Sequence, residues 1–425
     1  MADLGIRRED KNPWERRAPL TPWHVEELVR EQGRSVVIQP SERRIYADEE
    51  YRAAGAEVAE DLSDARVILC IKEVPPRLLL PAKPYLAFFH VIKGQPHNMP
   101  ILRRALELRC TLVDYEKVVD RSGQRLIFFG RHAGHAGMID ALWALGRRLA
   151  AEGVASPFAD VRPAHAYGGF AEATAFLEHE VGRRIREQGI GPALHPLVVG
   201  FTGGGNVAQG AQEVLDHLPV VAVHPDELPG LAADPGRSHR AVYKVVFRRD
   251  QRVDFARHLP YLTVLVNGIF WAPGDPRLVT RADAARLWGG GNTPKLRVIA
   301  DLSCDVFGGI EINVQVTDPG APVYVFEPAT GAARMGVEGH GPVILAVDNL
   351  PCELPRDASE HFGDALFPFL APLAAADYRA PYDRLGLPPE LLGAVIAHAG
   401  ELAPPFAYLE AALAEHAPLA AAAVG

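Results

Sequence analysis

Short apolar runs alternate along the chain with segments in which apolar residues recur every three or four positions. The runs predict buried strands, and the periodic segments predict helices that pack on them. The expected strands of the first part lie at residues 36–40, 65–71, 85–90 and 111–116, and the expected helices at 22–33, 48–56, 98–108 and 136–151. This alternation is typical of an α/β fold.

The clearest single pattern begins at Leu197. A charge-free run, Leu197 to Phe201, leads into Gly203, Gly204 and Gly205, and apolar residues then recur at helical spacing up to Leu218. This order predicts a strand, a tight turn and a helix, in which the helix amides face a pyrophosphate. A glycine-rich surface turn is the alternative, but the flanking strand and helix favour a dinucleotide. The cofactor-binding residues expected here are Gly203, Gly205, Asn206 and Val207.

The residues that follow bear on the choice between NAD and NADP. An acidic residue about 20 positions after the first glycine would hold the ribose 2′-hydroxyl of NAD. His224 stands there instead, and Asp226 and Glu227 come slightly later. A basic cluster then follows, made of Arg237, His239, Arg240, Lys244, Arg248 and Arg249. The cluster favours NADPH or NADP, with NAD as the alternative, although a solvated charged loop would explain it nearly as well.

Further candidate side chains directly follow predicted strands. Lys72 comes after the run 65–71, His90 ends the run 85–90, and Asp305 follows the run 296–303. The carboxyl ends of strands are where open α/β sheets bind ligands. A surface lysine, a buried core histidine and a turn carboxylate are the structural alternatives.

The composition excludes several classes of protein. The net charge of −9 gives no electrostatic reason to expect binding to nucleic acid or to an anionic membrane. No apolar run reaches the roughly 18 residues of a membrane span, and the polar start is unlike a signal peptide, so we expect a cytoplasmic protein. The four cysteines are far apart, so neither a disulfide framework nor a metal site is expected.

The pattern also suggests how the chain is divided. We expect a discontinuous substrate or catalytic domain at 1–150 plus 336–370, because the segment after residue 336 breaks the preceding pattern. Residues 151–335 would form the dinucleotide-binding domain, and the Ala- and Pro-rich residues 371–425 a helical C-terminal extension.

Several motifs in a fixed order resemble one enzyme family. They are LGIRREDKNPWERRAPLTP, ILCIKEVPP, AFFHVIKGQ, LVDYEKVVD, FTGGGNVAQGAQ, VNGIFW, IADLSCD and AVDNLPCELPRDASEHFGD. They resemble the lysine-ketoglutarate reductase portion of aminoadipate semialdehyde synthases. That portion is similar to the lysine-forming saccharopine dehydrogenases and, more remotely, to alanine dehydrogenases. The resemblance implies two Rossmann-like doubly wound α/β domains with an interdomain active-site cleft.

The resemblance also implies a reaction and a set of site residues. The ε-amine of lysine would condense with 2-oxoglutarate, and a reduced nicotinamide would convert the imine to saccharopine, reversibly. Lys72 and His90 match the acid/base pair, and Asp305 matches an aspartate beside the nicotinamide. The substrate site would contain Lys11, Glu15, Arg17, Lys93, Gln95 and Glu116. The saccharopine-cleaving, glutamate-forming partner activity would come from a separate chain.

Two departures leave the substrate specificity open. Arg131 and His132 stand where an aromatic residue is expected, and His224 replaces the acidic residue of an NAD site. One alternative is therefore the reductive amination of another amine and keto acid, as in alanine dehydrogenase or opine-forming enzymes. The other is a nucleotide-binding subunit without catalytic activity.

Overall fold

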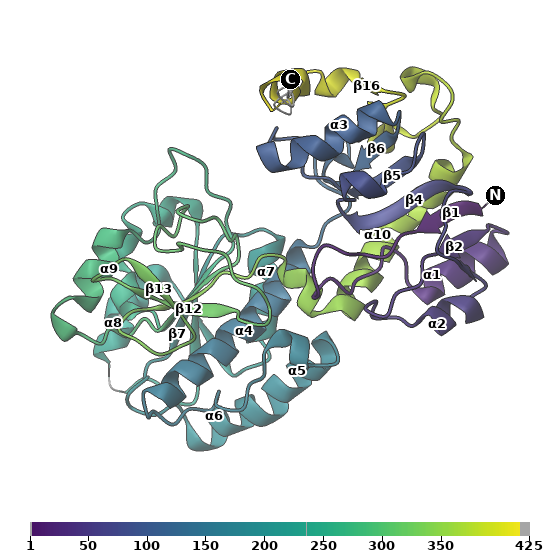
Figure 1. The fold of residues 1–425 in the computed structure, drawn as a ribbon. Coiled ribbons are helices and arrows are strands. Elements are labelled where there is room, and N and C mark those ends of the chain that lie inside the picture. Colours follow the sequence, from purple (N-terminus) through teal and green to yellow (C-terminus); the bar gives the residue numbers. More distant parts are fainter. Residues whose placement is uncertain (1, 235, 417–425) are drawn as a thin grey trace, which may run out of the picture. The chain divides into compact units, whose positions relative to one another are not determined.

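The computed structural model describes residues 2–234 and 236–416, so Met1, Pro235 and 417–425 of the expected domains lie outside the described residues. The chain forms two compact units. Unit 1 contains the residues up to Phe128 and those from Pro355 onward, and unit 2 is Phe129–Leu354. In Figure 1 the purple and the yellow elements accordingly belong to the same unit.

The division between the units differs from the expected boundaries after residues 150 and 335. Helix α4 (Gly130–Ala151) belongs to unit 2 because it packs on α7 (Asn206–Leu215) and on strands of that unit. Residues 336–354 stay in unit 2 because strand β14 (Val343–Leu345) pairs with β11 (Val298–Asp301).

Unit 1 is built on an eight-stranded sheet of order β16-β15-β6-β5-β4-β1-β2-β3. Its parallel strands are β1 (Ala2–Ile6), β2 (Val36–Ile38), β3 (Glu57–Val58), β4 (Ala65–Lys72), β5 (Pro84–Phe88) and β6 (Thr111–Asp114). Their order, 3-2-1-4-5-6, is that of the Rossmann fold, with its topological switch point between β1 and β4. Strand β1 falls in a charged segment and was missed by the sequence pattern.

The C-terminal region of unit 1 is only partly helical, which corrects the expected helical extension. Strands β15 (Val395–His398) and β16 (Glu401–Leu402) extend the sheet, because β15 pairs antiparallel with β6. The helices of unit 1 are α1 (Pro22–Glu26), α2 (Asp48–Ala53), α3 (Met99–Glu107), α10 (Pro355–Ala375), α11 (Pro389–Leu392) and α12 (Leu409–Glu415).

Unit 2 is built on a second eight-stranded sheet, of order β13-β12-β14-β11-β10-β7-β9-β8. The strands not yet given are β7 (Val198–Thr202), β8 (Val220–Val223), β9 (Val242–Phe247), β10 (Val264–Asn267), β12 (Val323–Glu327) and β13 (Ala332–Met335). Strand β9, and not β8, is the neighbour of β7, whereas sequence order would place β8 there.

Both faces of the unit 2 sheet are covered. Val199 and Phe201 of β7 contribute to one apolar cluster, and Val198 contributes to the other, as the alternation along a strand requires. The remaining helices are α5 (Phe170–Phe176), α6 (Arg183–Gln188), α8 (Leu228–Ala233) and α9 (Arg281–Trp288). None of the helices in the described residues is both long enough and apolar enough to span a bilayer.

Helices α4 and α7 cross at two glycines. A Cβ at Gly134 would lie 2.1 Å from the carbonyl oxygen of Val207, and one at Gly210 would lie 2.2 Å from that of Arg131. Each glycine therefore lets one helix backbone lie directly against the other. This contact positions the helix that follows the glycine turn.

Candidate functional site

Lys72 is the last residue of β4 and lies at the carboxyl edge of the unit 1 sheet. The backbone N–H groups of Ile71 and Lys72 donate hydrogen bonds of 2.6 and 3.0 Å to the carboxylate of Glu9, which follows β1. Burial, and then the positive charges of Arg17 and Lys11, lower the pKa of the Lys72 amine. These surroundings disfavour the charged form of the amine, and a neutral amine can accept a proton.

His90 follows β5 on the same edge of the sheet and adopts a left-handed backbone conformation, with φ of 54°. Its Nδ1 lies 3.3 Å from Oε1 of Glu116. The hydrogen bond with His90 lowers the pKa of Glu116, and the charge of Arg125 lowers it further. The carboxylate of Glu116 therefore orients the imidazole.

A second carboxyl group, that of Asp114, lies beneath this pair. Asp114 accepts hydrogen bonds from the backbone N–H groups of Phe89, at 3.2 Å, and of Glu116, at 2.9 Å. Burial and the charge of Glu116 raise the pKa of Asp114 to about 7, so it titrates in the same range as an ordinary histidine. The ends of β5 and β6 are held together by these bonds.

Two ion pairs surround Lys72. Lys11 lies 2.8 Å from Glu73, and this bond holds the pKa of Glu73 below its usual range although burial opposes the shift. Arg17 donates from Nε and Nη2 to the two carboxylate oxygens of Glu15, at 2.7 and 2.5 Å, and both side chains have 0% exposure. Glu15 thus engages one edge of the guanidinium that was expected to bind a substrate carboxylate.

Lys93 and Gln95 lie in the loop after β5 and are both exposed. The positive charge of Lys93 contributes to the low pKa of Glu116, so Lys93 lies near the His90 pair. Gln95 supplies its backbone carbonyl to the N–H of Asn98, and the described residues give its side chain no hydrogen bond. In unit 1, Lys11, Glu15 and Arg17 therefore lie around Lys72, and Lys93 and Glu116 lie beside His90, whereas no such contact is seen for Gln95 among the described residues.

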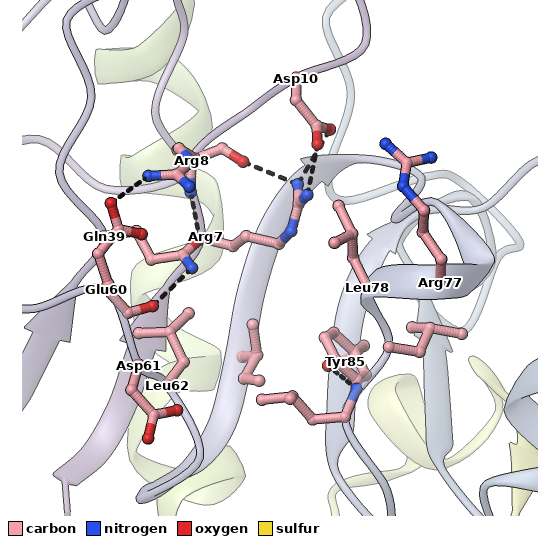
Figure 2. A pocket seen from close by; sticks show the side chains of 13 residues that line it. Arg7, Arg8, Asp10, Gln39, Glu60, Asp61, Leu62, Arg77, Leu78 and Tyr85 are labelled. Atoms are coloured by element: carbon pink, nitrogen blue, oxygen red, sulfur yellow. Dashed lines mark hydrogen bonds and ion pairs between the residues drawn. The ribbon is translucent and has the colours of Figure 1, made fainter.

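A nearby cavity of about 280 Å³ on unit 1 is distinct from this cluster. Figure 2 shows the Arg7 guanidinium pointing toward Asp10, at 2.6 Å, and Arg8 toward Glu60, at 2.8 Å. Arg77 and Leu78 lie on the opposite wall (Figure 2). None of the expected site residues lines this cavity. Arg7 and Arg8, which do line it, already have acidic partners, so the cavity is not the candidate active site.

The glycine turn of unit 2 has the open backbone that a pyrophosphate requires. Gly203 has φ of 99°, and a Cβ there would lie 2.7 Å from Ile269, whereas a Cβ at Gly204 or Gly205 would meet nothing within 4 Å. Helix α7 begins at Asn206, and no side chain caps its first amides. The turn and the exposed amides therefore fit the diphosphate of a dinucleotide.

A buried polar network joins the strand ends beneath this turn. The Thr202 hydroxyl donates to the side-chain oxygen of Asn267, whose amide donates to Asp301 at 2.8 Å. Ser303 and Asn313 also donate to the Asp301 carboxylate, at 2.7 and 2.8 Å. The ends of β7, β10 and β11 are thus fixed relative to one another, and sequence reasoning missed this network.

The remaining expected cofactor residues lie at different strand ends. Asp305 follows β11, and its charge contributes to the raised pKa of Asp301, which is due first to burial. His224 follows β8, the outermost strand, and its ring contacts Asp226 and Gln251.

Arg131 and His132 lie on α4 within unit 2. Arg131 forms an ion pair of 2.5 Å with Glu213 of α7, and His135 binds the same carboxylate at 2.8 Å. His132 is buried beside His135, with ring centroids 5.4 Å apart. Arg131 therefore takes part in the packing of α4 on α7, and His132 packs against His135 of the same helix.

Comparisons with known proteins agree with the two-unit fold and with the motifs. The family described as "Alanine dehydrogenase/PNT, N-terminal domain" matches residues 5–136. An alpha-aminoadipic semialdehyde synthase of Bos taurus is 36% identical to this chain, over 96% of this chain and 48% of its own length. An alpha-aminoadipic semialdehyde synthase of Arabidopsis thaliana is 35% identical, over 96% of this chain and 41% of its own length. A solved L-alanine dehydrogenase superposes with a TM-score of 0.63 at 20% identity, covering 97% of this chain and 100% of that one.

The chain belongs to the alanine dehydrogenase/saccharopine dehydrogenase superfamily of oxidoreductases. This confirms the resemblance predicted from the motifs. The chain spans less than half the length of the two synthases, so the activities of those whole proteins are not its own by likeness alone. Another relative, the "Saccharopine dehydrogenase [NAD(+), L-lysine-forming]" of Yarrowia lipolytica, is 26% identical over 88% of this chain and 93% of its own length. Superfamily membership implies a nicotinamide cofactor.

Two buried carboxyl groups and one half-buried carboxyl group of this superfamily member were not anticipated from its sequence. They are Glu9, Glu73 and Asp114, and each lies within or directly beside a motif that carried the resemblance. Burial and the charge of Glu15 raise the pKa of Glu9 to about 7. The motifs contain all three residues, but only the fold shows what they contact. Glu9 accepts from the Lys72 backbone N–H, Glu73 pairs with Lys11, and Asp114 accepts from the backbone N–H of Phe89, next to His90.

Proposed function

We propose that this chain is a lysine:2-oxoglutarate reductase that forms saccharopine. The observation that carries the proposal is the Lys72 amine, whose pKa is lowered among cationic neighbours on the sheet edge that also holds His90. The formation and dehydration of a carbinolamine require a group that accepts a proton and a group that donates one. The names of the two synthases and of the lysine-forming dehydrogenase support lysine as the amine.

Lys72 and His90 divide the proton transfers between them. The neutral Lys72 amine takes a proton from the lysine ε-nitrogen as that nitrogen attacks the ketone. Protonated His90, held by Glu116, gives a proton to the departing hydroxyl, which leaves as water and yields the protonated imine. A bound nicotinamide would supply the hydride that reduces the imine.

The charged neighbours have separate roles in this proposal. Arg17 is buried and fully paired with Glu15, so we assign Arg17 chiefly to lowering the pKa of Lys72, an effect that the charge of Glu15 opposes. Lys11 and the exposed Lys93 are better placed to bind the carboxylates of 2-oxoglutarate. Glu116 completes the substrate site by offsetting the positive charge, whereas the role of Gln95 stays a prediction from the motif.

The finer assignments of the proposal concern cofactor and context. NADPH is the expected reductant, because no acidic residue stands where NAD would need one. The small-molecule substrates are lysine and 2-oxoglutarate, or saccharopine in reverse, and a separate glutamate-forming saccharopine dehydrogenase would act on the product. The cytoplasm remains the expected compartment.

One spectrophotometric matrix tests the function. NADH or NADPH is offered with lysine, ornithine or ammonia, each with 2-oxoglutarate or pyruvate. The proposal expects NADPH oxidation that requires both lysine and 2-oxoglutarate. Turnover with ammonia and pyruvate in the absence of lysine would identify an alanine dehydrogenase-like enzyme. Tight dinucleotide binding with no turnover in any combination would identify a non-catalytic subunit.

A further inference from the structure

The strand order of unit 2 determines which residue lies where the adenosine ribose of a bound dinucleotide would be, and that residue differs from the one found by counting along the sequence. In the 3-2-1-4-5-6 order, the strand reached after the glycine turn and its helix lies beside the glycine strand, and the residue at its end contacts the ribose 2′ position. Counting along this chain assigns that role to the end of β8, at His224. Here β8 is outermost and β9 lies between β8 and β7. The strand that lies beside the glycine strand is therefore β9.

The register places a specific residue at that position. Thr202, the last residue of β7, pairs with Phe247, the last residue of β9. Gly203 and Arg248 consequently leave the sheet at the same level. Arg248 and the next residue, Arg249, are both exposed. Within the described ranges, 2–234 and 236–416, neither guanidinium has an acidic partner, whereas the neighbouring Lys244 is paired with Asp216 at 2.5 Å.

The rest of the basic cluster lies elsewhere or is already paired. Arg237 forms an ion pair of 3.1 Å with Asp234. Arg237 and Arg240 both precede Val242, the first residue of β9, so they lie at the amino end of the sheet. The six residues of β9 span about 20 Å at about 3.3 Å each. Only the two arginines at the carboxyl end of β9 are level with the glycine turn.

The backbone around Arg248 is held in place. Its N–H donates to Oε1 of Gln251 at 2.8 Å, and Nε2 of Gln251 lies 3.3 Å from Nε2 of His224. His224 also faces Asp226 at 3.3 Å. The imidazole is therefore engaged in joining the ends of β8 and β9, whereas Arg248 and Arg249 are both exposed.

We propose that Arg248, assisted by Arg249, binds the 2′-phosphate of NADP(H) and that His224 takes no part in this contact. The inference rests on the proposed function in that it requires a nicotinamide dinucleotide at the glycine turn. A guanidinium binds a phosphate through charge-assisted, often bidentate hydrogen bonds. The unphosphorylated ribose of NAD(H) gains nothing from these arginines, so they determine which of the two dinucleotides is bound.

Direct binding tests the assignment without turnover. The fluorescence of NADPH and of NADH is titrated with the wild type and with the Arg248→Ala/Arg249→Ala variant. We expect a loss of NADPH affinity of roughly 10- to 100-fold, as for a charge-assisted hydrogen bond, with NADH affinity unchanged to within about twofold. Arg240→Ala is the matched control, since it removes an exposed arginine from the other end of β9, and it should leave both affinities unchanged. His224→Ala should also leave them unchanged.

Three results would overturn the assignment. They are wild-type NADPH affinity in the double variant, an equal loss of NADH and NADPH affinity in that variant, and a loss of NADPH affinity in His224→Ala alone. The substrate matrix separates this outcome from that of the reaction. If NADPH binds through Arg248 but lysine and 2-oxoglutarate are not turned over, the proposed reaction is wrong, whereas the assignment of Arg248 to the 2′-phosphate stands. If turnover occurs and the double variant still prefers NADPH, the assignment alone is wrong.

Discussion

The Arg17–Glu15 pair shows how burial changes the role of a charged side chain. Its sequence motif predicts an arginine that binds a substrate carboxylate, but the fold gives both side chains 0% exposure and joins them by two hydrogen bonds. Removing one partner of such a buried pair leaves an uncompensated charge, which costs about 3–5 kcal/mol. We therefore expect any Arg17 variant to lose stability as well as activity.

Lys72 and His90 could be placed from the sequence, because each follows an apolar run whose carboxyl end lies at the edge of a sheet. We predict that Lys72→Met and His90→Gln each lower kcat by about 10² or more, since each removes a proton-transfer group. NADPH affinity should be unchanged in both. Lys83→Met is the control, because Lys83 binds the carbonyl of Ala65 at the opposite end of β4 and should keep wild-type kcat. Wild-type turnover in either test variant would remove its assigned role.

The pH profile of turnover tests the environment of Lys72. Lys72 must be neutral to accept a proton, so kcat rises as the pH rises through its lowered pKa. Lys11 is one of the cations that lower this pKa, so Lys11→Met should raise it and move the acidic limb of the kcat profile to higher pH. A limb that stays in place, or moves to lower pH, would contradict the assignment of this limb to Lys72.

Glu9 could not be identified from the sequence, because its partners lie on β4 and the charged segment around it has no periodicity. Glu9→Ala leaves the buried N–H groups of Ile71 and Lys72 without their acceptor, at a cost of about 1–3 kcal/mol each. We predict a loss of about 2–5 kcal/mol in the free energy of unfolding, measured in urea, and a lower kcat. Glu60→Ala, which breaks the exposed ion pair with Arg8, should cost less than about 1 kcal/mol.

At the scale of elements, periodicity predicted most of the strands and helices but missed strands such as β1 and β15, and it did not give the strand order. The pattern predicted β7, the glycine turn and α7 in sequence, and the structure confirms them. The apolar residues of a predicted strand do not show which other strand pairs with it. The exposed Val221 of β8, at 43%, is the kind of detail that marks an outer strand, but it is visible only after folding.

The crossing of α4 and α7 gives a prediction at this scale. Gly134→Ala and Gly210→Ala each place a methyl group against a backbone carbonyl that cannot move without shifting its helix. We predict a loss of about 1–3 kcal/mol or more in unfolding free energy for each, as for overpacked cores. Gly230→Ala, in α8, meets nothing within 4 Å and should be neutral or slightly stabilising. Equal stability of all the variants in thermal melts would show that the crossing is looser than described.

At the scale of the molecule, the sequence predicted a discontinuous unit but placed the boundaries of its parts at other residues than the structure does. The expected return at residue 336 precedes β14, which pairs within unit 2. The Ala- and Pro-rich composition after residue 371 also hid two strands, because β15 is a short apolar run among helical residues. Both differences come from strand pairing between residues far apart in the sequence, β14 with β11 and β15 with β6, which composition does not reveal.

A truncation tests the role of these late strands. A chain ending at Gly386 lacks β15 and β16 and leaves the apolar residues Leu112 and Val113 of β6 on an open sheet edge. We predict a lower melting temperature and concentration-dependent aggregation, measured by calorimetry and light scattering. Glu401→Ala, an exposed change in β16, should have neither effect. A truncated chain that stays monodisperse with an unchanged melting temperature would show that β6 needs no cover.

The split construction of unit 1 also sets an order of events during synthesis. All the strands of unit 2 have been translated by residue 345, but the sheet of unit 1 lacks its covering strand until residue 398 has left the ribosome. The middle of the nascent polypeptide can therefore reach its native state first. Until β15 is available, the edge of β6 is uncovered and can pair with a non-native strand. We expect a chaperone to be needed most during this period.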